Sequence, residues 1–128
     1  MSTIQLLELK QMIRTKPESE YRKPDKQTRK LLLYLFTGTR GGYTRLKIIE
    51  LLLQRPYNTH QLAQLLDFDY KAIQHHMKVL EKNNLVNRMG EKYGAIFHIS
   101  NFLEFNIRAL DDAIKILERK MNTKKVYY

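Results

Sequence analysis

Apolar side chains recur at helical spacing over most of this chain and alternate with polar ones in a short stretch before residue 100. The stretch from Asn58 to Asn84, NTHQLAQLLDFDYKAIQHHMKVLEKNN, predicts two short helices joined by a tight turn. Asp67 and Asp69 bracket that turn, and Asp69 is well suited to N-cap the second helix. The pattern predicts a helix-turn-helix. The apolar stripe of its first helix is Leu62, Leu65 and Leu66.

The second helix of this motif has two unlike sides when residues are placed about 100° apart. One side is expected to contribute to the core and consists of Ile73, Met77, Leu80 and Asn84. The opposite side is polar and can enter a groove of nucleic acid; it consists of Tyr70, Lys71, Gln74, His75 and Lys78.

The chain before this motif predicts three further helices. Residues 4–13 form a short amphipathic pattern, expected either to pack on their own domain or to reach a second subunit. Residues 15–27 are polar, contain two prolines and predict a linker. A helix is expected over 28–36, and another over 45–54 with Thr44 as its N-cap.

The loop between those last two helices, Gly38 to Gly42, reads GTRGG. Successive backbone N–H groups before a helix suit an anion, so the loop is either a plain turn or a DNA-backbone contact that includes Arg40. It is not a P-loop, because the Gly-Lys-Ser/Thr ending is absent. On the helix that follows, Arg45 and Lys47 are expected to be exposed and to contact phosphates.

Two strands are expected over 85–89 and 95–100, joined by a glycine-bounded loop. They form either a wing that touches DNA or a plain hairpin edge. Asn84 precedes the first strand at a position that requires a left-handed conformation, which asparagine tolerates. The inward residues are predicted to be Ala95, Phe97 and Ile99, and those near the tip to be Arg88, Lys92 and Tyr93.

The last predicted helix begins after Ser100 or Asn101 and is followed by a basic tail. Its apolar residues follow one another at intervals of 4, 3, 4, 3 and 4, which is typical of a seam for another helix. We expect this seam to join two subunits; the alternative is packing within one subunit. The seam residues are Leu103, Ile107, Leu110, Ile114, Leu117 and Met121.

Composition narrows the class of protein. The chain has 128 residues, a net charge of +10 and no cysteine. One small domain with a polyanionic partner is expected, without disulfides or thiolate metal sites. No run of 18 apolar residues and no signal-peptide plan occurs, which favours a cytoplasmic protein without membrane contact. His75 and His76 point about 100° apart and cannot chelate one ion together, so we expect His76 to be structural and no metal or cofactor to bind.

Charge is distributed unevenly around the motif. Residues 28–57 hold six basic residues and one acid, whereas residues 58–84 hold three of each. Arginine and lysine are thus expected to fix the protein on phosphates while neutral polar side chains read bases, unless the surplus is an ordinary solvated face. Gln74 suits an adenine edge, and Lys71 or Lys78 suits a guanine or a phosphate. Thr59, at the start of the motif, is also expected to contact DNA.

The segment TRLKIIELLLQRPYNTHQLAQLLDFDYKAIQHHMKVLEKNNLV resembles the DNA-binding core of ArsR-like winged-helix regulators over about a third of the chain. The lead-in GTRGGYTR looks like an archaeal branch of that superfamily. The family often has a small hydroxyl residue where Gln74 stands, so base preference does not carry over. Metal-sensing members use Cys in the motif helix or Asp and His on the last helix; here the last helix has Asp111 and Asp112 but no His.

We therefore predict a mainly α fold with a small β-hairpin, a winged helix-turn-helix with N- and C-terminal dimerisation helices. The expected division is an N-terminal helix and linker over 1–27, the DNA-binding domain over 28–100, and a dimerisation helix with a basic tail over 101–128. The expected function is sequence-specific binding of double-stranded DNA as a homodimer that regulates transcription, not catalysis. The alternatives are an architectural, chromatin-like DNA-coating protein and a protein-interaction adaptor.

Overall fold

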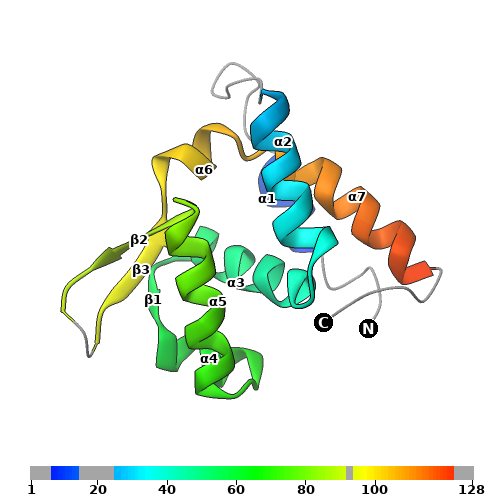
Figure 1. Cartoon of the computed structure of the whole chain (residues 1–128). Coiled ribbons are helices and arrows are strands. Elements are labelled where there is room, and N and C mark those ends of the chain that lie inside the picture. The colour runs from blue at the N-terminus through cyan, green and yellow to red at the C-terminus, as the bar shows by residue number, and fades with distance from the viewer. Residues whose placement is uncertain (1–6, 15–24, 92–93, 123–128) are drawn as a thin grey trace. The chain divides into compact units, whose positions relative to one another are not determined.

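The computed structural model describes residues 7–14, 25–91 and 94–122 (Figure 1). Two expected wing contacts, Lys92 and Tyr93, lie outside the described residues, as does the side chain of Met121. The elements are, in chain order, α1 (Leu7–Arg14), α2 (Lys26–Leu33), the π-helix η3 (Tyr34–Gly38), α3 (Gly42–Gln54), β1 (Tyr57–Asn58), α4 (Thr59–Leu66), α5 (Tyr70–Lys82), β2 (Val86–Met89), β3 (Ile96–Ile99), α6 (Asn101–Phe105) and α7 (Ala109–Asn122).

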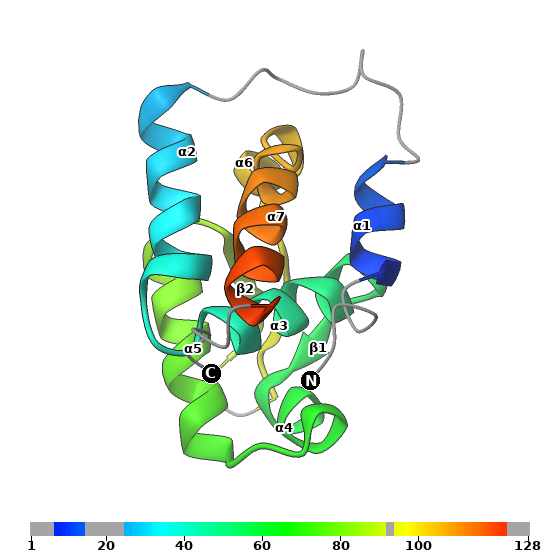
Figure 2. The ribbon, with the colours of Figure 1, turned by 90° about the vertical axis from the view of Figure 1, so that its right-hand side faces the viewer.

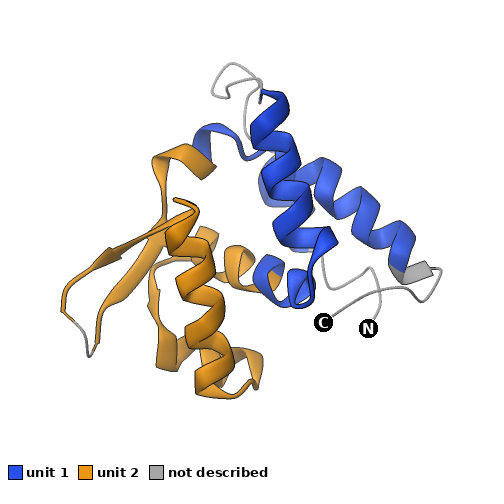
Figure 3. Ribbon diagram, viewed as in Figure 1, with its two compact units in different colours: residues 1–46, 104–128 blue, residues 47–103 orange. Residues whose placement is uncertain are grey.

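These elements group into two compact units, drawn in different colours in Figure 3. Unit 1 comprises residues 1–46 and 104–128, and unit 2 comprises residues 47–103. Helix α3 contributes its first turn to unit 1 and the rest to unit 2. The grouping differs from the division drawn from the sequence, because α2 belongs with the terminal helices rather than with the helix-turn-helix.

Unit 2 has the architecture of a winged helix-turn-helix, as predicted. Helices α4 and α5 are the helix-turn-helix, and β2 and β3 form an antiparallel hairpin beside α5 (Figure 1). A short strand that the sequence pattern did not reveal, β1, completes a three-stranded sheet of order β1-β3-β2. The register places Phe97 of β3 opposite both Tyr57 of β1 and Arg88 of β2. The predicted mainly α fold with a small β-hairpin is confirmed.

Local capping explains where α4 begins and ends. The side chain of Asn58 accepts a hydrogen bond from the Gln61 backbone N–H at 2.7 Å, and the Gln61 side chain accepts one from the Asn58 N–H at 2.9 Å. This reciprocal capping box satisfies two backbone donors that the helix itself leaves unpaired. At the other end Asp67 takes a left-handed conformation, φ 54°, and the Phe68 N–H reaches back to the Ala63 carbonyl at 3.0 Å. The predicted turn therefore closes on the first helix.

The second helix of the motif starts where predicted, but without the predicted cap. Helix α5 follows Asp69, whose side chain makes no capping hydrogen bond. After the helix, Asn84 has the expected left-handed conformation, with φ 60°. The Leu85 N–H then bonds to the Leu80 carbonyl at 2.9 Å, which starts the first strand of the wing.

The core of unit 2 uses most of the predicted apolar positions. Ile73, Met77 and Leu80 of α5 are buried, and so are Leu62, Ala95 and Phe97. Leu65 was predicted to be part of the same stripe, which is wrong, because its side chain is 55% exposed. The inward face of α4 lies between Leu62, Ala63 and Leu66, and a residue at position 65 falls about 100° away from its centre.

Unit 1 is a small helical cluster in which α7 packs against α1 and α2 (Figure 2). The described part of the apolar stripe is buried in this single chain: Leu103 of unit 2, and Ile107, Leu110, Ile114 and Leu117 of unit 1, are each at most 2% exposed. That observation favours the alternative in which the stripe packs within one subunit. The expected continuous helix is also wrong, because residues 106–108 form a turn that separates α6 from α7.

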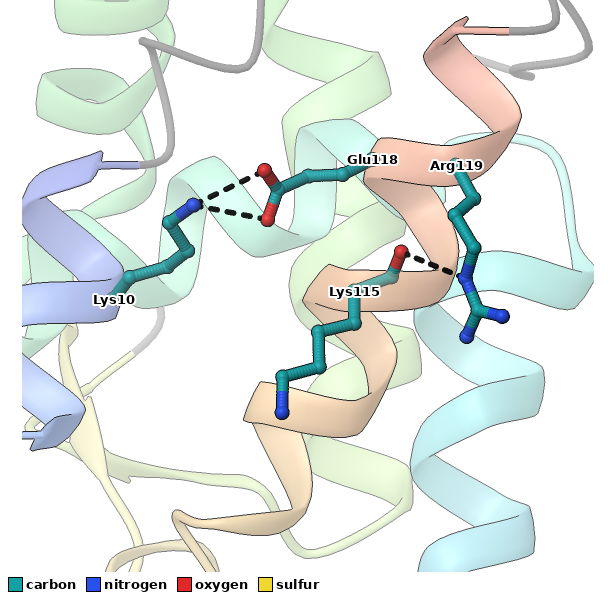
Figure 4. A network of polar contacts seen from close by, with 4 residues as sticks. All are labelled: Lys10, Lys115, Glu118 and Arg119. Atoms are coloured by element: carbon teal, nitrogen blue, oxygen red, sulfur yellow. Dashed lines mark hydrogen bonds and ion pairs between the residues drawn. The ribbon is translucent and has the colours of Figure 1, made fainter.

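Ion pairs join α7 to the neighbouring helices of unit 1. The amino group of Lys10 in α1 lies 3.0 Å from a carboxylate oxygen of Glu118 in α7 (Figure 4). Arg29 of α2 pairs with Asp112 of α7, also at 3.0 Å. Two acids of α7, Asp112 and Glu118, are therefore engaged by cations of the neighbouring helices.

The glycine-containing loop that leads into α3 is closed by Arg45. Its guanidinium donates to the Leu35 carbonyl at 3.0 and 2.8 Å, to the Thr39 hydroxyl, and to the Arg40 carbonyl at 3.3 Å. Arg45 is 3% exposed, so the prediction that it is exposed is wrong. The π-helix η3 and the turn after it point backbone carbonyls inward, and the guanidinium satisfies them. Burial lowers the pKa of Arg45, although a guanidinium stays protonated at neutral pH.

The expected starts of the two helices on either side of this loop need correction. Helix α3 begins at Gly42, so Thr44 is a buried helical residue rather than the N-cap. Gly42 permits the close approach of two backbone segments, because a Cβ atom there would lie 2.2 Å from the Phe36 carbonyl oxygen. The preceding helix also starts earlier than expected, at Lys26, where the Asp25 side chain accepts from the Thr28 N–H at 2.7 Å.

Candidate nucleic-acid interface

The outward face of α5 is polar over its whole length. The five residues predicted for that face are all exposed: Tyr70, Lys71, Gln74, His75 and Lys78. Because Ile73, Met77 and Leu80 anchor the opposite face in the core, packing fixes which residues of α5 face outward. These residues form a row of hydrogen-bonding groups that includes two cations.

A hollow of about 220 Å³ lies between the start of α4, the outward face of α5 and the wing. Buried side chains of Met77, Ala95 and Phe97 form part of its lining. The remaining lining residues, most of them polar, are Asn58, Thr59, His60, Tyr70, Gln74, Lys78, Arg88 and Gly94. The structure thus brings five predicted contact residues together: Thr59, Tyr70, Gln74, Lys78 and Arg88.

Arg88 of the wing is held in place by two contacts. Its guanidinium donates to the Glu81 carboxylate at 3.2 and 3.3 Å, and it lies over the Phe97 ring at 5.2 Å from the centroid. Both Arg88 and Glu81 are about one-third exposed, so this pair is solvated and worth little stability. Its effect is to position the arginine between α5 and the wing.

Other predicted cations are less available than the sequence implied. Lys47 pairs with Glu50 at 2.8 Å, and its side chain is only 21% exposed. Arg40 is exposed and Arg45 is buried, and both belong to unit 1. Some of the basic residues before the motif are therefore engaged in contacts within the protein.

The two adjacent histidines of α5 differ in their burial. His76 is buried at 9% exposure, in keeping with a structural role, whereas the adjacent His75 is exposed. Their ring centroids lie 5.8 Å apart with the planes inclined at 57°. Within the described ranges, no three His, Cys, Asp or Glu side chains gather as a metal site would require.

Sequence reasoning did not identify Asn58, His60 or Gly94 as members of this surface. Asn58 and Gln61 stand at the spacing of a capping box, which would have fixed the first turn of α4 and with it the place of His60. His60 lies beside Tyr70, with ring centroids 6.4 Å apart. Gly94 enters the lining only because the wing folds back toward α5, which no local pattern predicts.

Comparisons with known proteins agree with this architecture. Residues 43–88, a little over a third of the chain, match the family model described as "Bacterial regulatory protein, arsR family". Two solved structures are similar: reduced HlyU from Vibrio cholerae, at 20% identity and a TM-score of 0.51, covering 73% of this chain and 88% of that one, and a second HlyU structure from the same organism, at 18% identity and 0.51, covering 76% and 96%. No curated protein matches the chain significantly. The structural likeness supports the winged helix-turn-helix fold.

Proposed function

We propose that this protein binds double-stranded DNA and regulates transcription. The observation that carries the proposal is the exposed polar face of α5, held on a winged helix-turn-helix by its buried opposite face. The match of residues 43–88 to the arsR family model supports the same function. So does the net charge of +10, which favours a polyanionic partner.

In the proposed complex, α5 enters the major groove and the wing lies on its flank. Residues near the N-terminus of a recognition helix usually make the base contacts, so Tyr70, Lys71 and Gln74 are the proposed readers. Arg88 then contacts the backbone beside the groove, together with Lys92 and Tyr93 of the wing. Arg45 is not part of the proposed interface, because its guanidinium is buried within unit 1.

We further propose that the protein acts as a homodimer in the cytoplasm, on the DNA of the nucleoid. One recognition helix reads a single half-site, and two linked copies gain affinity when both half-sites are occupied together. The apolar stripe of α7 is covered within one chain, so a different surface must join the subunits. Among the described residues of unit 1, the exposed large apolar side chains are Tyr34, at 60%, and Phe105, at 53%.

The proposal is tested by selecting bound sequences from a pool of random duplexes and then measuring affinity for the selected and for a scrambled duplex at two salt concentrations. A regulator binds the selected duplex preferentially, and its affinity for both duplexes falls steeply with salt. Failure to bind any duplex would contradict the proposal and favour an adaptor that uses this fold without DNA.

A single substitution, Gln74→Ala, tests the sequence specificity of DNA binding. Gln74→Ala should cost about 1 to 3 kcal/mol of binding free energy on the selected duplex and flatten the base preference, because a bidentate contact to adenine is lost. Lys78→Ala is the matched control on the same face, because Lys78 lies one turn beyond the proposed readers, and it should weaken binding to all duplexes more evenly. The reverse pattern for the two variants would show that Gln74 does not read a base.

The second candidate is an architectural protein that coats DNA with little sequence preference. The charge of +10 on only 128 residues favours it, since phosphate contacts alone supply non-specific affinity. In the selection experiment this candidate gives steep salt dependence without enrichment of any sequence.

A further inference from the structure

The hollow between α4, α5 and the wing has a chemistry that points to one kind of ligand group. None of the described residues that line it is acidic, whereas Lys78, Arg88 and His60 line it together with the hydroxyls of Thr59 and Tyr70. Hydrogen-bond donors and cations that converge on a concave site without a carboxylate suit an anion. The start of α4 adds its own positive partial charge, because Asn58 is its N-cap and Thr59 and His60 are its first residues.

The cations of the hollow differ in their availability. Lys78 is exposed and forms no ion pair with any described residue. Arg88 is held by Glu81 at 3.2 Å, which keeps its guanidinium beside α5. Lys78 is therefore the group on which an incoming anion depends most, and Arg88 is a second contact already close to its place.

The hollow is small, with a volume of about 220 Å³. Pockets for whole cofactors and drug-sized molecules begin near 300 Å³. A single phosphate group with part of its sugar or hydration shell matches the available space.

We propose that the hollow binds one phosphate group, and that this group is a phosphodiester of the DNA strand that passes between the recognition helix and the wing. The assignment of DNA as its source rests on the proposed function. Tyr70, Gln74 and Lys78 line the hollow and also belong to the outward face of α5, so a strand contacted by that face lies next to the hollow. The bound phosphate would fix the register of α5 and the wing on the same strand.

The test combines a protein variant with a change in the DNA. Methylphosphonate is an uncharged substitute for the phosphodiester, and it is placed at one backbone position at a time in the selected duplex. Wild-type protein should lose roughly tenfold in affinity at one position per half-site, where a charge-assisted hydrogen bond is removed. Lys78→Gln should bind the unmodified duplex roughly tenfold more weakly and show little further loss at that same position.

Lys71→Gln is the matched control, because Lys71 is exposed on the same helix but does not line the hollow. This variant should keep the full loss of affinity on methylphosphonate substitution at the backbone position where Lys78→Gln shows little further loss. His60→Gln, which changes a residue of α4 that lines the hollow, should reduce that sensitivity as Lys78→Gln does. If the losses of binding free energy from Lys78→Gln and from methylphosphonate were additive at every backbone position, the proposal would be overturned.

Inorganic phosphate distinguishes the two possible sources of the group. Chemical shifts of the Gln74 and Gly94 backbone amides are followed as phosphate replaces chloride at constant ionic strength. Saturable binding at millimolar phosphate or below, without the position-specific effect in DNA, would assign the hollow to free phosphate and overturn the DNA source. If the protein bound no duplex, the proposed function would fail, and this titration alone would then support or reject a phosphate site.

Discussion

A buried guanidinium holds together the turn that leads into α3. Arg45 donates to two backbone carbonyls, those of Leu35 and Arg40, and to the Thr39 hydroxyl. A buried carbonyl that loses its donor costs about 1 to 3 kcal/mol. The residue therefore contributes to the stability of unit 1 rather than to a surface field.

Replacing Arg45 should show that contribution directly. We expect Arg45→Met to lower the free energy of unfolding by about 2 to 4 kcal/mol, because the loop carbonyls lose their partner. Urea denaturation measures the loss, and Arg40→Met, at an exposed position of the same loop, should change stability by less than about 0.5 kcal/mol. A stable Arg45→Met protein whose salt slope for DNA binding fell by about one would instead identify Arg45 as a phosphate contact.

The pair of Glu81 and Arg88 gives a second prediction for a single residue. Glu81 neutralises a wing cation that lines the hollow, and its own charge faces the surface proposed to meet DNA. Glu81→Gln should therefore raise the affinity for any duplex and steepen the salt slope by about one, since Arg88 gains a phosphate as its partner. Unchanged affinity and slope would mean that Arg88 does not reach the backbone. Glu91→Gln, which removes a charge from the wing loop, is the control for a general electrostatic effect.

At the scale of elements, helical periodicity identified the helix-turn-helix because α5 separates its apolar and polar residues cleanly. Strand alternation likewise predicted the wing, and Asn84 predicted the left-handed residue before it. The two-residue strand β1 was missed because a stretch that short has no period to detect. Its pairing with β3 is a tertiary effect.

The features that were predicted wrongly depend on tertiary packing, which a local pattern of residues does not reveal. A regular apolar spacing continues through residues 106–108, although the backbone leaves the helix there, so the pattern suggested one long helix. The π-helix η3 and the buried position of Arg45 depend on how the loop packs against itself. Among the site residues, exposure on α5 followed from periodicity, whereas the hollow required the fold of the wing.

The apolar stripe of α7 yields a prediction for this element. Ile114 is fully buried in the single chain, so Ile114→Glu places a charge in the helical core of unit 1. We expect a loss of about 3 to 5 kcal/mol, which leaves the protein partly or wholly unfolded given ordinary stabilities of about 5 to 15 kcal/mol. Circular dichroism and thermal melting measure this effect, and the neighbouring exposed position, Lys115→Glu, is the control. A folded, monomeric Ile114→Glu protein would instead make the stripe an interface between subunits.

At the scale of the whole molecule, the net charge overstates the number of basic side chains that are available to bind DNA phosphates. Arg29, Arg45 and Lys47 are engaged by groups of the protein itself, and they are half of the six basic residues that precede the motif. Of the five residues predicted for the outward face of α5, only Lys71 and Lys78 are cations. Specific affinity at moderate salt must therefore come from base contacts and from the joining of two half-sites.

That requirement leads to the prediction on assembly. A homodimer should bind a duplex with two half-sites, about 34 to 36 Å apart, some 10² to 10⁴ times more tightly than a duplex with one. Changing the half-site spacing by half a helical turn should remove most of this gain, because the two recognition helices then face different sides of the DNA. Sedimentation of the free protein gives its oligomeric state, and titration of the three duplexes gives the affinities.

Variants then locate the interface. Tyr34→Lys and Phe105→Glu replace the large apolar side chains that the described part of unit 1 exposes. A substitution at the dimer contact should yield a folded monomer. That monomer should bind a single half-site as well as the wild type does but lose the gain on the full site. Leu65→Glu, at an exposed position of unit 2, is the control and should leave the oligomeric state unchanged. A wild-type protein that sediments as a monomer and binds one and two half-sites equally well would contradict the proposed homodimer.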